Sequence, residues 1–298
     1  MKHTLIFAAM LGGLVSGQGP LQPEKVTPLE FPQSTQVRDF AVAGRSAYFL
    51  MCHQERTAKL QILDLSTYGV RSTLDVDPHS LRIAEVSPAL VIIARDPTGS
   101  RLQIFESSGI RVTKHFPATH IVDCGRVRPG LACATFDEIL TLAENDAYDE
   151  LPWGRARFSF TDLALTQFSS HGELFAVSVM DGRMLRVDAQ TRIQTGVRTL
   201  LAPELQQAVR PKGAAMIRSA AVSDNGELYV LATGAKLHEG VPVLRFDQNA
   251  NWLQNVRLAM PTTNLGHPMY PSYLRISSGH LYVVDRSAKL MATYRLPR

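Results

Sequence analysis

The segment of residues 219–258 reads SAAVSDNGELYVLATGAKLHEGVPVLRFDQNANWLQNVRL. It contains four short apolar runs, and we name the strands that they predict A to D in chain order: 219–222, 228–232, 243–246 and 252–258. The turn between A and B is Asp224-Asn225-Gly226, and these residue types tolerate the positive φ of tight hairpins. The segment therefore predicts one four-stranded antiparallel blade.

The same pattern occurs six times along the chain. In each unit a short apolar strand B is followed by a turn and then by a strand C that begins with leucine: Leu60, Leu102, Leu140, Leu185, Leu244 and Leu290. The steps between these leucines are 42, 38, 45, 59 and 46 residues, and the longest step contains a predicted short helix at residues 203–210. A repeat of about 40–50 residues made of short strands is typical of a β-propeller. We expect an all-β, six-bladed β-propeller over residues 37–298.

The sixth unit lacks a strand D, because the chain stops soon after its strand C. An open sheet edge at the point of ring closure would be unfavourable. Residues 18–36 precede the first unit, and within them 25–31 alternate like a strand. Nearby prolines, Pro23, Pro28 and Pro32, suit an edge strand. The sequence therefore predicts that the N-terminal segment supplies the outer strand of the last blade.

Residues 1–17 have the pattern of a secretory signal peptide. Lys2 precedes an apolar run at residues 4–14, and small residues follow at 15–17. The run is shorter than the roughly 20 residues that span a bilayer, so we expect no transmembrane segment in the mature chain. This predicts an exported protein, periplasmic or secreted; the alternative is that the segment stays as an uncleaved anchor.

Composition bounds the class of protein and its partners. Apolar residues make up 45% of the 298 residues, which is enough for a large core, and the net charge is +4. The chain has no block of five basic residues, so nothing predicts nucleic-acid binding. Of the three cysteines, Cys124 and Cys133 lie on the two arms of one predicted hairpin. They either form a disulfide or are two buried thiols, and Cys52 has no evident partner.

One family resemblance can be traced to particular residues. Residues 222–230, VSDNGELYV, resemble the opening of an NHL repeat, and 244–249, LRFDQN, are similar to its second half. Residues 280–285, HLYVVD, are similar to the same pattern. The resemblance implies an NHL-like six-bladed propeller, a family that includes binding scaffolds and metal-dependent lyases and lactonases. No residue matches the catalytic residues of those enzymes.

Candidate site residues gather on one predicted face. In a propeller the B–C loops and D–A connections surround one mouth of the central channel. Six of the eight histidines after the signal lie in or beside these segments, and arginines and aromatics accompany them. The candidate binding residues are His53, His79, Arg95, His120, Arg155, Arg157, His238, His267, Tyr270 and Arg286. Arginines suit carboxylate or phosphate groups and aromatics suit sugars or peptide side chains.

The same face leaves a metal site open as an alternative. Histidine is the commonest metal ligand, and Zn or Ca would need about three converging groups. Asp77, Asp96 and His115 are further polar residues of this region. The sequence has no HExxH, no CxxC pair and no nucleophile elbow. The simpler interpretation is that polar loops collect solvated His, Asp and Arg. Arg155 and Arg157 would share a strand face and either bind a ligand or pair with nearby carboxylates.

Three functions follow as hypotheses. The first is an exported, non-enzymatic binding module that presents a polar loop face to a peptide, glycan or protein. The second is a metal-dependent lyase or lactonase-type hydrolase with its site at the channel mouth. The third is a structural subunit of an envelope assembly. The sequence does not decide whether the protein is an enzyme.

Overall fold

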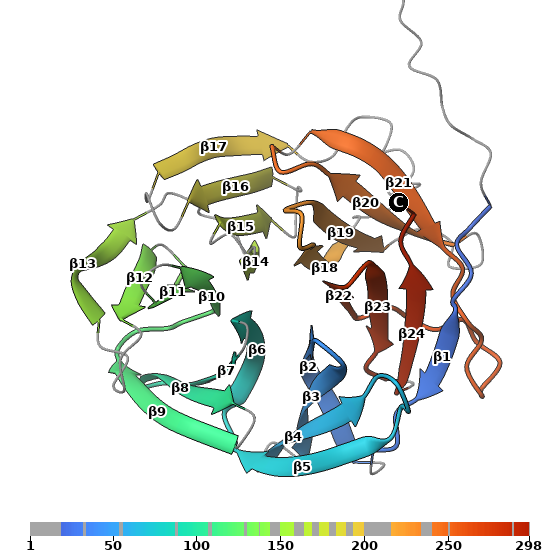
Figure 1. Ribbon diagram of the computed structural model, residues 1–298, viewed down its shortest axis with the longest axis horizontal. Helices are drawn as coiled ribbons and strands as arrows, with labels where there is room; N and C mark the ends of the chain where they lie inside the picture. The colour runs from blue at the N-terminus through green and yellow to red at the C-terminus, as the bar shows by residue number, and fades with distance from the viewer. Residues whose placement is uncertain are drawn as a thin grey trace, which may run out of the picture.

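The computed structural model is a ring of four-stranded antiparallel sheets, six in the described part of the chain (Figure 1). It describes residues 19–31, 34–53, 56–86, 89–106, 109–127, 130–136, 138–143, 150–157, 164–168, 173–178, 183–188, 193–199, 216–233, 240–249, 251–287 and 289–297. The predicted all-β propeller fold is confirmed. The predicted helix at 203–210 and the predicted signal peptide at 1–17 lie outside the described residues.

The first three sheets follow the order of the chain, with the first strand nearest the axis and the fourth outermost. Blade 1 contains β2 (Thr35–Ala43), β3 (Ser46–His53), β4 (Thr57–Asp64) and β5 (Val70–Val76). Blade 2 contains β6 (Ser80–Val86), β7 (Ala89–Asp96), β8 (Gly99–Glu106) and β9 (Gly109–Pro117). Blade 3 contains β10 (Asp123–Val127), β11 (Gly130–Ala134), β12 (Glu138–Ala143) and β13 (Glu150–Arg157).

The remaining sheets continue around the ring, and the last of them includes a strand from the N-terminal segment. Blade 4 contains β14 (Ala164–Phe168), β15 (Glu173–Ser178), β16 (Arg183–Asp188) and β17 (Ile193–Thr199). Blade 5 contains β18 (Met216–Val222), β19 (Leu228–Thr233), β20 (Val241–Phe246) and β21 (Trp252–Leu258). Blade 6 contains β22 (Tyr273–Ser277), β23 (His280–Asp285), β24 (Leu290–Arg295) and, as its outer strand, β1 (Lys25–Pro28).

The core lies between neighbouring blades. Residues 89–94 of β7 are all buried, because both faces of the sheet are covered, whereas the outermost strand β5 is exposed at most positions. Leu231 and Val243 of blade 5 belong to the same buried cluster as Leu274 and Val283 of blade 6. The apolar runs of the sequence therefore become strands whose two faces pack against different neighbours.

The ring closes through the N-terminal segment, as the sequence predicts. β1 is antiparallel to β24, in a register that runs from Lys25 opposite Thr293 to Pro28 opposite Leu290. The strand ends at Pro28, earlier than the predicted 31, because the chain then turns inward and buries Leu29. In Figure 1 the blue β1 lies beside the red β24.

Residues on either side of β1 attach to two further blades. Leu21 N donates a hydrogen bond to Arg257 O (2.7 Å), and Ala259 N donates to Leu21 O (2.9 Å), so this residue bridges to blade 5. On the other side, the ring of Phe31 lies 5.7 Å from that of Phe49 in blade 1. The segment of residues 19–31 therefore contacts blades 5, 6 and 1.

The hairpin of blade 3 contains a disulfide. Cys124 of β10 and Cys133 of β11 are directly opposite in the register, and their sulfur atoms are bonded. Of the two alternatives that the sequence left open, the disulfide is the one present. Cys52 is a free, buried cysteine.

Replacing both paired cysteines by alanine is expected to lower the free energy of unfolding by about 2–3 kcal/mol, because the bond closes a loop of roughly ten residues. Guanidinium unfolding of the parent and of the double variant, each with and without a thiol reductant, measures the difference in the free energy of unfolding. The Cys52→Ala variant is the matched control, and reductant should lower its midpoint as it does in the parent. An unchanged parent midpoint after full reduction would show that the bond contributes nothing.

Within the described residues, no helix has the length and hydropathy needed to span a membrane.

Candidate functional site

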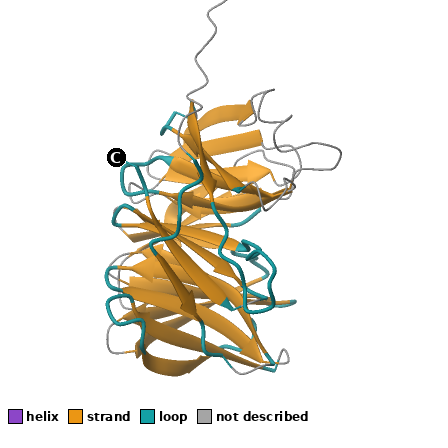
Figure 2. Ribbon diagram, turned by 90° about the vertical axis from the view of Figure 1, so that its right-hand side faces the viewer, coloured by secondary structure: helices purple, strands orange, loops and turns teal. Residues whose placement is uncertain are grey.

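Loops gather on two faces of the ring, which Figure 2 shows as the teal segments on either side of the sheets. The upper face is the one that carries the D–A connections and B–C loops, including residues 77–79, 97–98, 118–122, 259–272 and 286–287. The lower face carries the A–B and C–D turns, such as 44–45 and 224–226. The described candidate residues at strand ends and in loops belong to the upper face.

Bulges in two inner strands place arginines on the upper face. The extra residue is Arg38 in β2 and Arg218 in β18. Arg38 Nη1 donates hydrogen bonds to the carbonyl oxygens of Pro78 (3.1 Å) and Ser80 (2.8 Å). Arg218 Nη2 donates to the Tyr270 hydroxyl (2.9 Å). A bulge redirects the side chain of its extra residue. Each arginine consequently reaches the connection that leads into the next blade.

A further arginine, Arg286, lies at the junction of blades 6 and 1. Arg286 Nη2 donates a hydrogen bond to Oε1 of Gln36 (3.0 Å), which lies two residues before Arg38 on β2. The Tyr273 hydroxyl donates to Arg38 O (2.6 Å). Burial raises the pKa of Tyr273, the negative charge of Asp39 adds to this, and the positive charge of Arg286 opposes it. Tyr273 therefore contacts the main chain of Arg38 and the side chain of Arg286.

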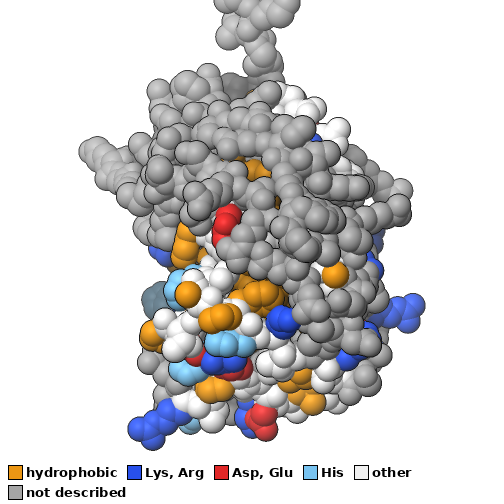
Figure 3. All heavy atoms as spheres, turned by 90° about the vertical axis from the view of Figure 1, so that its left-hand side faces the viewer, with side chains coloured by type: hydrophobic (Ala, Val, Ile, Leu, Met, Phe, Trp, Pro, Cys, Tyr) orange, Lys and Arg blue, Asp and Glu red, His pale blue; other side chains and the backbone are white. Residues whose placement is uncertain are grey.

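Blades 2 and 3 contribute an arginine and an exposed aromatic ring. The guanidinium carbon of Arg95, at the end of β7, lies 5.9 Å from the ring centre of Phe136. Phe136 is 54% exposed, and burial lowers the pKa of Arg95. Arg95 N donates to His79 O (3.1 Å). The side of the ring with β9 and β13 shows histidine, arginine and hydrophobic atoms intermixed in its described part (Figure 3). An arginine over an exposed aromatic ring, as Arg95 is over Phe136, is typical of contact surfaces between proteins.

Among the residues that the structure describes, the candidate histidines form no metal-binding group. His53 Nδ1 lies 2.8 Å from Ser34 Oγ. The other described histidines of the upper loops are exposed: His79, His120 and His267. In the described ranges, no three His, Cys, Asp or Glu side chains come together in a way that could hold a metal ion. The Zn or Ca alternative therefore has no described ligand set, and His238 lies outside the described residues.

Two carboxylates near this face are held by an arginine. Arg101 Nε donates to Asp77 Oδ2 (2.6 Å), and Arg101 Nη1 donates to Asp96 Oδ2 (2.5 Å). Burial alone would raise the pKa of Asp77, but the hydrogen bonds from Arg101 and from the main-chain N–H of His79, together with the nearby positive charge, outweigh it and lower the pKa. His115 lies on the outer strand β9, opposite Arg101 in the register and two residues before the strand ends, so it lies beside the connection to blade 3, as the sequence predicts.

Arg155 and Arg157 lie on the outer strand of blade 3. β13 pairs with β12, with Arg155 opposite Leu140 and Arg157 opposite Glu138. The two arginines are two residues apart on one strand, and the shared face that this spacing predicts stays a prediction. The side chains of this strand are not among those that the structure describes.

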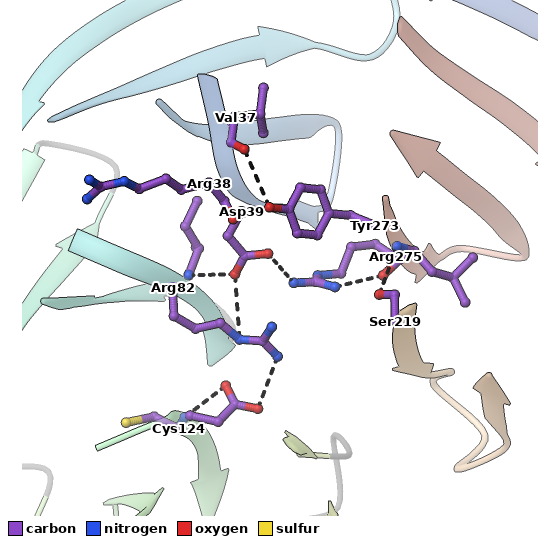
Figure 4. Close-up of polar contacts among 11 residues, drawn as sticks. Val37, Arg38, Asp39, Arg82, Cys124, Ser219, Tyr273 and Arg275 are labelled. Atoms are coloured by element: carbon purple, nitrogen blue, oxygen red, sulfur yellow. Dashed lines mark hydrogen bonds and ion pairs between the residues drawn. The ribbon is translucent and has the colours of Figure 1, made fainter. Parts of the chain in front are cut away.

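Below the upper mouth, four charged residues from four inner strands form a buried network (Figure 4). Arg275 Nη2 of β22 donates to Asp39 Oδ1 of β2 (2.6 Å). Arg82 Nε of β6 lies 3.5 Å from Asp39 Oδ2, and Arg82 Nη2 lies 3.4 Å from Asp123 Oδ2 of β10. Two arginines and two aspartates thus balance each other in charge and connect blades 6, 1, 2 and 3.

Main-chain hydrogen bonds fix the network to the strands. Asp39 Oδ2 also accepts a hydrogen bond from Ile83 N (3.0 Å) in blade 2. Ser219, which follows the bulge of β18 as Asp39 follows that of β2, accepts one from Leu274 N (3.0 Å) in blade 6. The residue after each bulge therefore links its blade to the next, which is a structural role.

The pKa shifts follow from burial and mutual charge. Burial raises the pKa of Asp123 and lowers that of Arg275. Burial would also lower the pKa of Arg82, but the charges of Asp123 and Asp39 outweigh it and raise the pKa. Partial removal from water raises the pKa of Glu85, on β6, to about 7, and the charge of Asp224 adds to this. Solvent still reaches this side chain, so water screens part of the effect.

The sequence did not single out the buried network or Arg38, Phe136 and Arg218 of the upper face. One signal was available, since Asp39, Arg82 and Arg275 interrupt apolar runs in the innermost strands. A charge within a strand that is apolar on both faces indicates a partner across the channel. The bulges that aim Arg38 and Arg218 have no comparable signal.

Comparison with known proteins identifies the fold alone. No family model matches the chain, and no curated protein matches it. The NHL resemblance of residues 222–230 therefore stays a prediction.

Solved structures of similar shape cover most of the chain. The β-propeller domain of Cps50 (Swd1) from Myceliophteria thermophila is 12% identical with a TM-score of 0.53, covering 92% of this chain and all of that one. Hydrazine synthase of Kuenenia stuttgartiensis is 11% identical with a TM-score of 0.56, covering 92% and 78%. A chain of the Mitotic Checkpoint Complex is 9% identical with a TM-score of 0.54, covering 99% and 100%. At these identities the similarity supports the β-propeller fold.

Proposed function

We propose that the protein is an exported β-propeller scaffold that binds a protein partner through its upper face. The observation that carries this proposal is that the described contacts of three arginines on this face do not neutralise their charge. The contacts that Arg38, Arg95 and Arg286 make in the described part of the chain are with neutral groups: carbonyl oxygens, an aromatic ring, an amide and the Tyr273 hydroxyl. Their charges are available to a partner.

The aromatic ring beside these charges supports a protein as the partner. Phe136 is more than half exposed, and Arg95 lies over its ring. Arginine and aromatic residues are enriched among the residues that contribute most to protein–protein binding. That one structure of similar shape belongs to the Mitotic Checkpoint Complex is consistent with a scaffold role. Export is the part of the proposal that rests on residues 1–17 alone.

The Phe136→Ala variant is expected to lose its partner. Loss of one such residue at the centre of an interface costs about 2 kcal/mol or more, which is roughly thirtyfold in affinity. Cross-linking in intact cells, followed by quantitative mass spectrometry, compares the partner recovered by parent and variant. The matched control is Trp252→Ala, which removes an aromatic ring of similar exposure from β21. Equal recovery by the parent and both variants would contradict the proposal, and cell fractionation tests export separately.

A further inference from the structure

The connection between blades 5 and 6, residues 259–272, forms an ordered hairpin on the upper face. Thr263 N donates a hydrogen bond to His267 O (2.8 Å), and Gly266 N donates to Thr263 O (3.0 Å). At its base, the fully buried side chain of Met269 belongs to the apolar cluster between blades 5 and 6. The tip of the hairpin is therefore held in place by its own hydrogen bonds and by the core beneath it.

A leucine occupies the tip of this hairpin. Leu265 is 76% exposed, which is more than any other large hydrophobic residue that the structure describes. Turn positions favour Gly, Pro, Asn, Asp and Ser, and the positive φ of this turn (+78°) falls on Gly266. Neither the turn nor the core explains a leucine at this position.

The rest of the connection has the composition of a contact surface. Residues 259–272 contain no Asp, Glu, Lys or Arg, and the centres of protein interfaces are depleted in charged residues and enriched in aromatic ones. Tyr270 is 39% exposed, and the guanidinium carbon of Arg218 lies 5.5 Å from its ring centre. Tyr270 N donates to Asp285 Oδ2 (2.7 Å). The same connection therefore presents an aromatic ring, attached to blade 6 through its main chain, together with the exposed leucine.

We propose that Leu265 is an anchor residue that enters an apolar pocket on the protein partner. This inference rests on the proposed function, in which the upper face binds that partner. An aliphatic anchor that fills a pocket is a recurrent element of protein interfaces. Because the hairpin is already ordered, binding would cost little conformational entropy.

A membrane is the other apolar environment that an exposed leucine could enter. A single myristoyl chain gives only marginal membrane binding, and a leucine side chain is much smaller. Residues 259–272 also lack the lysine and arginine that attract anionic lipids. A pocket on a protein therefore suits this hairpin better than a lipid surface does.

A photo-cross-linker at the exposed Asn264, next to the leucine, tests the contact. Benzoylphenylalanine replaces Asn264 in the full chain, intact cells are irradiated below saturation of the partner, and mass spectrometry quantifies the adduct. We expect the adduct to contain the same protein that the Phe136→Ala variant loses. Leu265→Ser should lower the adduct yield about tenfold, the lower end of what burial of a leucine contributes, whereas Leu265→Met keeps an apolar side chain and should retain most of it. The control Leu253→Ser removes an exposed leucine from β21, outside the upper face, and should leave the yield unchanged.

Unfolding does not confuse this comparison, because Leu265 is so exposed that its serine variant should melt like the parent. Equal adduct yields for the parent and Leu265→Ser would overturn the inference, and adducts with lipid in place of protein would assign the tip to a membrane. If position 264 gives no adduct while Phe136→Ala still loses the partner, the scaffold function holds and the anchor fails. An adduct that depends on Leu265 but not on Phe136 would support the anchor and contradict the role proposed for Phe136.

Discussion

Removal of residues 19–31 is expected to lower the melting temperature by more than about 10 °C and to make the protein self-associate. The segment contributes strand β1, the bridge of Leu21 to blade 5 and the burial of Leu29 among residues of blade 1. Loss of a buried leucine side chain alone costs about 2–5 kcal/mol, and each kcal/mol shifts the melting temperature by roughly 2–4 °C in a domain of this size class. The exposed edge of β24 would then offer a template for pairing with another chain.

Addition of the missing segment separates closure from general damage. A synthetic peptide of residues 19–31, added to the shortened protein, should restore much of the melting temperature, because it can pair with β24 in trans. Leu29→Ala and the neighbouring exposed Glu30→Ala form a matched pair, and only the first should be destabilising. A shortened protein as stable as the parent would mean that the ring does not depend on this strand.

Replacement of Asp39 by alanine is expected to cost about 3–5 kcal/mol of stability, or roughly 10 °C in melting temperature. Asp39 is 1% exposed in its side chain and is a charge partner of both Arg275 and Arg82. Its removal leaves the Arg275 guanidinium, only 10% exposed, without the carboxylate that it contacts at 2.6 Å. It also removes the acceptor of Ile83 N.

Asp75→Ala is the control for the Asp39 variant. The Asp75 side chain is 86% exposed and lies 3.7 Å from Lys59, so this surface pair should contribute less than about 1 kcal/mol. Thermal unfolding of both variants and the parent, followed by circular dichroism, gives the comparison. Similar melting temperatures for all three would show that water or another group replaces Asp39 in the channel.

The fold could be predicted from the sequence because strands and turns leave local signals. The turn at Gly226 has φ of +81°, which explains why glycine stands there, and the apolar run of β7 is buried on both faces. The closing strand could be predicted because the last unit was visibly one strand short. These features depend on residues that are close together in the chain.

The upper face could be predicted only in part, since it depends on register. The sequence placed Arg95, Tyr270 and Arg286 on the correct face, because loops between strands B and C, and between D and A, must lie there. It missed Arg38, which would point elsewhere without the bulge of β2. Whether histidines of different blades lie close enough to bind one metal ion depends on distances across the ring, and no local sequence pattern predicts those distances.

The pairing of β1 with β24 has a consequence for the order of events during synthesis. Strand β1 is synthesised before the other strands of the ring, and its partner, Leu290–Arg295, is synthesised after them. Five blades can form while the chain grows, but the ring cannot close until translation passes residue 295. A chain that stalls earlier would have an unpaired β1 and an incomplete final sheet, both with exposed strand edges. Closure of the ring therefore depends on completion of the last blade.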